Sequence, residues 1–430
     1  MLALFGFLTI VVFMYLIMSK RLSALIALML VPVLFGVIAG FSKDIGAMMV
    51  KGLEGVAPTG IMILFAILYF GIMIDSGLFD PLISQILRLV RGDPLKIALG
   101  TAVLAATVSL DGDGTTTYMI TISAMLPLYK RIGMKPIILA GIAISASGVM
   151  NLLPWGGPTA RVLASLNQDT SAVFVPVIPT MIGGILFVFL IAYIMGKKER
   201  KRLGVLKLDG NTLNEQAAAA DTASIKRPKM VWVNGILTIM LLICLIIELI
   251  PVPVLFMIGF AIAAMLNYPN LKEQKERLQS YAGNALSVVS MIFAAGIFTG
   301  ILTGTKMVDA MASVLISNIP SSLGPHWALI TAIISGPLTF FMSNDAFYFG
   351  IVPLIAKTAA SYGIDPAIIG RASLLGLPVH LFSPLVPSTY LLVGMVGAEL
   401  GELQRFFLKW ACGTAGVMIA VALILGIISF

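Results

Sequence analysis

Residues 109–118 read SLDGDGTTTY and lie in the middle of an apolar stretch that runs from 97 to 129. Asp111 and Asp113 flank a glycine, three threonines follow, and apolar arms extend on both sides. Ionisable residues are costly inside a membrane and mark functional sites there. The pattern predicts a re-entrant hairpin at 97–129, whose two arms enter and leave the bilayer on the same side. The alternative is an ordinary loop in which an aspartate caps the next helix.

A second stretch of this kind lies at 327–356, and its centre reads FMSNDAFYFG at 341–350. Ser343, Asn344 and Asp345 begin its second arm, at the place that DGT occupies in the first hairpin. Ser-Asn-Asp alone is common at the start of helices. The correspondence between the two tips is therefore what predicts a second functional hairpin at 327–356.

The rest of the chain has the composition of a membrane protein. Of its 430 residues, 59% are hydrophobic and only 11% are charged, which leaves too few polar side chains to cover a soluble protein. Apolar runs of about 20 residues, the length that crosses a bilayer, recur along the chain. We expect spans near 2–18, 22–41, 58–76, 136–166, 172–195, 231–250, 252–267, 282–304, 366–398 and 406–430.

The two halves of the chain correspond at an offset of 229 or 230 residues. A constant offset over a long stretch indicates an internal repeat. We divide the chain into a first repeat at 1–195, a polar linker at 196–229 and a second repeat at 230–430. Each repeat holds five spans and one hairpin, and because five is odd, the second repeat must be inverted. The matched pairs are Gly71 with Gly300, Asp80 with Asp309, Gly133 with Gly363, Pro136 with Pro366, Pro154 with Pro384 and Thr159 with Thr389.

The basic residues predict the orientation in the cell membrane. The net charge of +8 does not indicate a nucleic-acid partner, because 21 of the 28 lysines and arginines, Arg91 among them, fall on the linker's side of this topology. By the positive-inside rule, the linker is cytoplasmic and both termini are outside. Glu248, beside a proline at the end of a span, is expected at the membrane interface. The basic residues of the outer side are Lys43, Lys51, Lys306 and Lys357.

Two of the spans are interrupted. VMNLLPWGGPTARV at 149–162 and LPVHLFSPLVPSTY at 377–390 carry prolines and glycines that should unwind the spans at 136–166 and 366–398 in mid-membrane. Unwound segments free carbonyl groups for cations and amide groups for anions. These matched breaks are the strongest indication of a binding site in the sequence.

Polar residues of the tips and breaks are the candidate ligands. Arg161 is the candidate for a substrate carboxylate, because a guanidinium can hold one through two hydrogen bonds. His380 either contacts substrate or a proton, or joins two helices by a hydrogen bond. The other candidate substrate ligands are Gly114, Thr115, Thr116, Asn151, Gly157, Thr159, Ser343, Asn344, Ser388 and Thr389, and the candidates for a metal or coupling ion are Asp111, Asp113 and Asp345.

Motifs of soluble enzymes are absent from the sequence, which has no P-loop, no HExxH and no Rossmann glycines. Its 2 histidines exclude a histidine-rich metal site. We therefore expect a carrier without a tightly bound cofactor rather than an enzyme. Uphill transport by such a carrier would have to use an ion gradient.

Three phrases carry a resemblance to a known family: SLDGDGTTTYMITISAMLPLY, NLLPWGGPTAR and MSNDAFYFGIVPL. Together with the repeat, they resemble the citrate–metal/proton symporter family over essentially the whole chain. That family belongs to the ion transporter superfamily, which includes the sodium–dicarboxylate carriers. The resemblance implies an all-α polytopic membrane protein of the elevator type, a homodimer in which each subunit has a scaffold and a moving domain.

The tips depart from the pattern of the dicarboxylate carriers, in which each tip bears Ser-Asn-Thr. Ser343 and Asn344 match that pattern, but Asp345 replaces the threonine, and the first tip reads DGDGT. Free citrate, close to a trianion at neutral pH, would be repelled by these aspartates unless a cation lay between them.

The resemblance and this extra charge together imply import of citrate as a complex with a divalent metal of the Mg²⁺ or Ca²⁺ class, coupled to protons or another cation. One alternative is a sodium- or proton-coupled carrier of another organic anion, such as a dicarboxylate or gluconate. A channel is a more remote alternative, because duplicated hairpins favour alternating access.

Overall fold

The computed structural model describes residues 1–90, 92–205, 225–247, 249–318 and 320–429. Every regular element in these ranges is a helix, as the sequence predicted. The greater part of the linker, Arg91 and Glu248 lie outside the described residues, so the expectations for them stay predictions. Before the linker, α10 (Ile178–Leu203) continues past 195, and the basic KKERKR segment is helical.

Several helices are long and apolar enough to cross a membrane, as expected of a multi-pass membrane protein. Shorter apolar helices, such as α1 (Leu2–Met18) and α13 (Val252–Asn267), accompany them. The segment that contains α5 also meets these criteria, although the chain turns back at its end instead of continuing. The long helices are Ile45–Asp75, Pro94–Asp111, Thr170–Leu203, Pro228–Ile246, Leu271–Gly304 and Leu400–Ile424.

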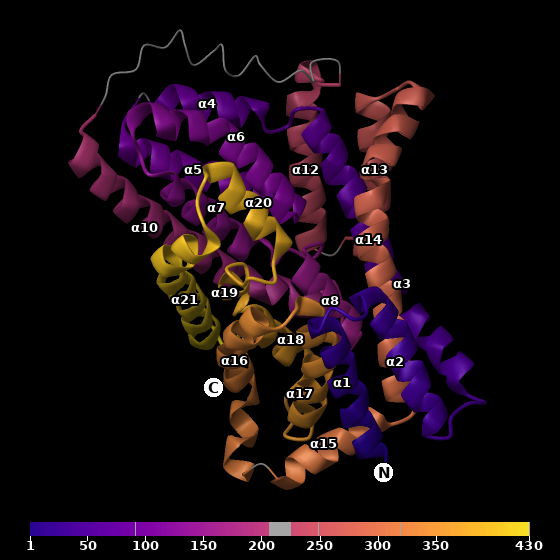
Figure 1. Cartoon of the computed structure of the whole chain (residues 1–430). Helices are drawn as coiled ribbons and strands as arrows, with labels where there is room; N and C mark the ends of the chain where they lie inside the picture. The colour runs from indigo at the N-terminus through magenta and orange to yellow at the C-terminus, as the bar shows by residue number, and fades with distance from the viewer. Residues whose placement is uncertain (91, 206–224, 248, 319, 430) are drawn as a thin grey trace.

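The helices repeat in the same order in both halves, and the second set is inverted. In Figure 1, α4 and the bases of α5 and α6 lie at the top, whereas α15 and the base of α16 lie at the bottom. The first set is α1, α2 (Ala24–Ile38), α3 (Ile45–Asp75), α4 (Asp80–Val90), α5 (Pro94–Val108), α6 (Gly114–Ile132), α7 (Pro136–Met150), α8 (Gly157–Leu166) and α10. The second set is α12 (Val231–Ile246), α13, α14 (Leu271–Gly304), α15 (Met307–Asn318), α16 (Trp327–Phe341), η5 (Ala346–Ile351) with α17 (Val352–Ala360), α18 (Pro366–Leu374) with α19 (Leu377–His380), α20 (Pro387–Val396) and α21 (Leu400–Ile424).

Two long helices, α3 and α14, pack along each other. Glycines allow this contact, since a Cβ atom added to Gly52 would lie 2.0 Å from the carbonyl oxygen of Gly296. Small residues let helix backbones approach closely in membranes, where lipid offers no hydrophobic drive for association. We call α3 and α14 the central pair. Both begin earlier than expected, at Ile45 and Leu271, because amphipathic turns precede their apolar parts.

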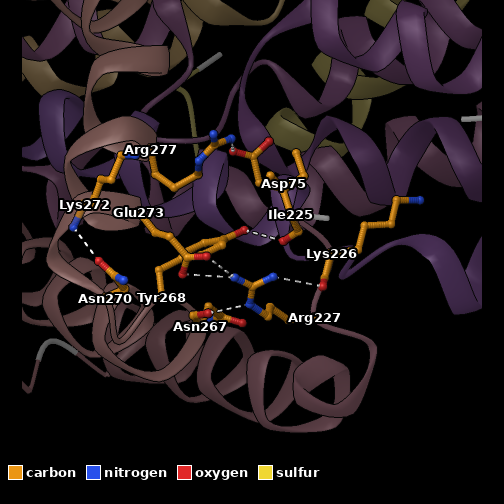
Figure 2. Close-up of polar contacts among 10 residues, drawn as sticks. All are labelled: Asp75, Ile225, Lys226, Arg227, Asn267, Tyr268, Asn270, Lys272, Glu273 and Arg277. Atoms are coloured by element: carbon orange, nitrogen blue, oxygen red, sulfur yellow. Dashed lines mark hydrogen bonds and ion pairs between the residues drawn. The ribbon is translucent and has the colours of Figure 1, made fainter. Parts of the chain in front are cut away.

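The end of the linker is fastened to the second half of the chain (Figure 2). Arg227 forms hydrogen bonds with both carboxylate oxygens of Glu273 at 3.1 Å, and its guanidinium lies 4.7 Å from the ring centre of Tyr268. The Tyr268 hydroxyl donates to the carbonyl of Ile225 at 3.0 Å. Burial, reinforced by nearby negative charge, raises the pKa of Tyr268 to about 12, so this hydroxyl remains a donor at neutral pH.

At the same end of the molecule, an ion pair joins the two helices of the central pair. Arg277 on α14 binds Asp75, the last residue of α3, with Nη1 at 3.0 Å from Oδ2. The Tyr281 hydroxyl donates to the other carboxylate oxygen of Asp75 at 2.9 Å. Polar contacts therefore fix the register of α3 against α14 at the linker's end, while glycines do so near the other end.

Candidate functional site

The first tip is a short turn between α5 and α6, closed by its two aspartates. Asp113 caps α6: its carboxylate accepts from the amides of Thr115 and Thr116 at 3.2 and 3.1 Å and from the Thr116 hydroxyl at 2.9 Å. Asp111 accepts from the Asp113 amide at 2.9 Å. The Asp113 carboxylate therefore has the helix-capping role that was the alternative at this position. The hydroxyl of Thr116 is engaged in this cap.

A tryptophan joins the first tip to the first break. The indole Nε1 of Trp155 donates to the carbonyl of Leu110 at 2.9 Å. Gly112 lies under the indole with a φ of 79°, and a Cβ atom there would come within 2.6 Å of the ring. Only glycine fits this position, because the backbone is left-handed and the ring leaves no room for a side chain. Trp155 also stacks on Phe70 of α3, with ring centres 5.2 Å apart.

Each break is closed by a buried threonine. The Thr159 hydroxyl donates to the carbonyl of Leu152 at 2.8 Å, and the Thr389 hydroxyl donates to that of Leu381 at 2.6 Å. Both threonines are fully buried. The structure thus places these two candidate ligands within the backbone of the breaks, where each satisfies a carbonyl that the interrupted helix leaves unpaired.

The second tip is tied to the first break by charge. Arg161 Nε lies 2.7 Å from Asp345 Oδ1, and Arg161 Nη1 donates to the carbonyl of Gly157 at 2.9 Å. The Ser343 hydroxyl accepts from the Ala346 amide at 3.2 Å, at the start of the second arm. The ion pair joins Arg161, which was expected to bind substrate, to Asp345, which was expected to bind a cation. The charges of the two side chains neutralise each other.

Two further polar residues of the second repeat reach the same region. The amide oxygen of Asn344 is buried and has no hydrogen-bond partner in the part of the chain that the structure describes. His380 Nδ1 donates to the carbonyl of Thr339 at 2.6 Å, which makes the helix-to-helix bond considered in the sequence. Asn344 therefore keeps an unused acceptor, whereas one nitrogen of His380 serves the fold.

A cavity of about 210 Å³ lies between the tips, the breaks and the central pair. It collects most of the candidate ligands from both repeats. Of the other candidates, Thr115, Thr116, Thr159, Ser343, Asp345 and Thr389 do not line it. The candidates that line it are Asp111, Asp113, Gly114, Asn151, Gly157, Arg161, Asn344, His380 and Ser388.

Residues that the sequence did not single out complete the wall. Trp155 belongs to the PWGG phrase of the first break, so the sequence placed it near the site but did not indicate its contact with the first tip. Ile67 of α3 and Asn284 and Val288 of α14 face the cavity from the central pair. The sequence could have indicated Asn284, because it is an isolated amide side chain at the point where α14 becomes apolar.

The acidic residues do not gather into a metal cluster. Within the described ranges, no group of three or more His, Cys, Asp or Glu side chains is placed to hold a metal ion. In the cavity, Asp111 and Asp113 lie on one tip, and Asn344 offers an oxygen from the other. These oxygens are ligands of the type that Mg²⁺ and Ca²⁺ prefer.

Comparison with known proteins gives a consistent result. A family model described as citrate transporter matches residues 12–376. A protein of Bacillus subtilis (strain 168) named citrate transporter is 66% identical over 430 residues, which cover 100% of both chains. Another protein of that strain, named Mg(2+)/citrate complex secondary transporter, is 53% identical over 430 residues, covering 100% of this chain and 99% of the relative.

Two solved transporters share the fold at low sequence identity. The YdaH transporter of Alcanivorax borkumensis has a TM-score of 0.58 and 15% identity, over 90% of this chain and 88% of its own. MtrF of Neisseria gonorrhoeae, described as illuminating a class of antimetabolite efflux pumps, has a TM-score of 0.52 and 15% identity, over 89% and 84%. The likeness extends over nearly the whole chain, so it concerns the architecture of both repeats.

Proposed function

Because this chain belongs to the citrate transporter family, we propose that it imports citrate as a complex with a divalent cation, driven by protons. Mg²⁺ and Ca²⁺ are the class of metal we assign, as part of the substrate rather than as a resident cofactor. The family consists of transporters, so no enzymatic activity is assigned. The protein acts as a secondary carrier in the cell membrane.

The charge of the cavity is the observation that carries this proposal. Arg161 is the lining residue that would attract a carboxylate, but Asp345 already balances its charge at 2.7 Å. Asp111 and Asp113 then leave the wall acidic. Two like charges about 4 Å apart repel by roughly 1 kcal/mol in water and by several times more at lower effective dielectric. Chelation of a divalent ion removes two charges from citrate and presents a cation to the acidic tip.

The same two carboxylates are where we place the coupling proton. Asp111 is 8% exposed, and its carboxylate accepts a hydrogen bond from the Asp113 amide at 2.9 Å. We assign the proton to the pair Asp111 and Asp113 rather than to either residue, because both line the cavity and the Asp111 carboxylate binds the Asp113 amide. Ionisable groups inside a membrane domain are the ordinary carriers of coupling protons.

We place the motion between the central pair and the unit formed by the hairpins and broken helices. The cavity lies at the boundary between them, with Ile67, Asn284 and Val288 on the side of the central pair. This division supports an elevator mechanism, in which the cargo-holding unit slides along a scaffold that contains α3 and α14. A homodimer would hold two such scaffolds together, and the charge asymmetry supports a cytoplasmic linker.

Uptake of labelled citrate into proteoliposomes tests the proposal. An inward proton gradient should drive uptake when Mg²⁺ or another divalent ion is present, and a chelator should abolish it. Labelled metal should enter with labelled citrate at a fixed ratio near one. Full uptake of citrate in metal-free buffer would contradict co-transport and would indicate an ion-coupled carrier of free organic anions. Counterflow of unlabelled citrate would distinguish a carrier from a channel.

A further inference from the structure

The central pair contributes one polar side chain to the cavity, and that contribution is unequal between the repeats. Ile67 and Val288 are apolar, whereas Asn284 presents an exposed amide. At the repeat offset of 229, the position equivalent to Asn284 is Gly55, which has no side chain. From this inequality, we propose that Asn284 is a further substrate-binding residue that contacts the metal–citrate complex only when the site faces the linker's side of the membrane. The inference rests on the proposed function.

The contacts between α3 and α14 place the cavity along the central pair. The helices run antiparallel, because Gly71 approaches Tyr281 at one end and Gly52 approaches Gly300 at the other. Ile67 lies 8 residues before the end of α3 at Asp75, which is about 12 Å at 1.5 Å per residue. The beginning of α3 is about 33 Å away on the same scale. The cavity therefore lies nearer the end of the pair that carries the linker.

At the other end of the central pair, a larger cavity of about 580 Å³ is lined by residues of α3, α14 and the end of α8. Gly55 and Asn167 lie on its wall, and a Cβ atom added to Gly55 would come within 3.0 Å of the Asn167 amide oxygen. In the proposed elevator motion, the sliding unit would move toward this end of the central pair. The present arrangement is thus the state in which the candidate site lies at the linker's side.

Inverted repeats relate the two end states to each other, because each repeat adopts in one state the arrangement of its partner in the other. When the site faces the far side, the equivalent position on the central pair is therefore Gly55 and not Asn284. The amide of Asn284 can accept from a hydroxyl or bind a cation through its oxygen, and it can donate to a carboxylate. Glycine has no side chain that could make any of these contacts. The cargo should then have this amide contact only on the linker's side.

Transport measured separately from the two sides tests this inference. The probe is labelled citrate with Mg²⁺, and its counterflow is compared in right-side-out and inside-out vesicles from the same cells. Asn284→Ala should raise KM three- to tenfold for transport from the linker's side, the loss expected for one partly exposed hydrogen bond. KM from the other side should stay within twofold of wild type, and so should the maximal rate.

Ser287→Ala is the matched control, because Ser287 is exposed on the same helix and does not line the cavity. It should leave both KM values unchanged. Equal KM changes on the two sides, or no change on either, would overturn the role of Asn284 while leaving the proposed function intact. If the wild-type protein does not carry citrate with Mg²⁺ at all, the proposed function itself fails. Chromatography in detergent verifies that each variant is folded.

Discussion

Arg161 of the first repeat and Asp345 of the second form an ion pair, with Nε at 2.7 Å from Oδ1, beside the cavity of about 210 Å³. Their side chains are only 18% and 14% exposed. The pair joins the first broken helix to the second hairpin tip, so it links the two inverted halves at the point where both contribute to the site. Its two charges cancel, which leaves the acidic first tip to set the charge that a substrate meets.

Removing one partner of this pair should impair both stability and transport. Asp345→Asn leaves the guanidinium of Arg161 without its counter-charge. For a fully buried pair such a change destabilises a protein by about 3–5 kcal/mol, and the remaining exposure should reduce this figure here. We expect a lower melting temperature in detergent and loss of citrate uptake at matched expression.

A double variant distinguishes the two effects. Arg161→Gln combined with Asp345→Asn removes both charges and should recover much of the melting temperature, since no unpaired charge remains buried. Uptake should still be lost if Arg161 also orients a substrate carboxylate with its free N–H groups. Wild-type uptake by the double variant would show that the pair serves the fold alone.

Asp113 combines a helix cap with a charge, and two substitutions separate these roles. Asp113→Ser keeps an oxygen that can accept from the amides of Thr115 and Thr116, so α6 should keep its start. Asp113→Ala should lower stability by about 1 kcal/mol, the usual effect of losing a cap. If the charge serves transport, both variants lose coupled uptake, and only the alanine variant melts earlier. Normal uptake by Asp113→Ser would reduce Asp113 to a cap.

The sequence predicted the location of the site better than it predicted the role of each residue in it. A polar tip or a proline-rich break stands out against apolar surroundings, so the hairpins and broken helices could be predicted without a structure. The contacts between individual polar groups could not be predicted in this way. The pairing of Arg161 with Asp345, for example, depends on how the two inverted halves cross. Thr159 and Thr389 look like ligands in the sequence, yet their hydroxyls bind backbone carbonyls inside the breaks.

Other features had weak or misleading signals. The helices α4 and α15 were not predicted, because each is too short, at 11 and 12 residues, to be read as a span. Pro58 was read as the start of a span, but α3 continues through it from Ile45. A helix can accommodate proline in a membrane protein when neighbouring groups satisfy the freed carbonyl.

Gly112 offers a test of the contact between the first tip and Trp155. Gly112→Ala should lower the melting temperature and uptake, because the new Cβ atom would come within 2.6 Å of the indole at a φ of 79°. Gly363 has the same φ of 79° with nothing within 4 Å of an added Cβ atom. Gly363→Ala therefore includes the backbone strain of about 1–2 kcal/mol but not the clash. The extra loss in Gly112→Ala measures the clash, and equal losses would contradict it.

Labelling of single cysteines tests the orientation. We expect a cysteine placed in the 210–225 segment to react in whole cells only with membrane-permeant reagents, because 21 basic residues lie on the linker's side. Cysteines placed near Lys43 or Lys357 should react with impermeant reagents. Both native cysteines are replaced first, since Cys412 is exposed and Cys244 is partly so. The reverse pattern would invert the proposed topology.

The last prediction separates the two roles proposed for the acidic tip. Asp111 lines the cavity, is buried, and accepts a hydrogen bond at Oδ1 from the Asp113 amide. If this carboxylate touches the metal ion, Asp111→Asn should change the order in which divalent ions support citrate uptake, because an amide is a weaker ligand for hard cations. If it carries the proton, the order of metals should stay the same, while the dependence of uptake on external pH flattens. Uptake of citrate measured with Mg²⁺, Ca²⁺, Mn²⁺ and Co²⁺ over a range of pH gives both readouts from one set of vesicles. A variant in which metal order and pH profile both match wild type would remove Asp111 from the mechanism and leave Asp113 as the remaining acidic group of the first tip.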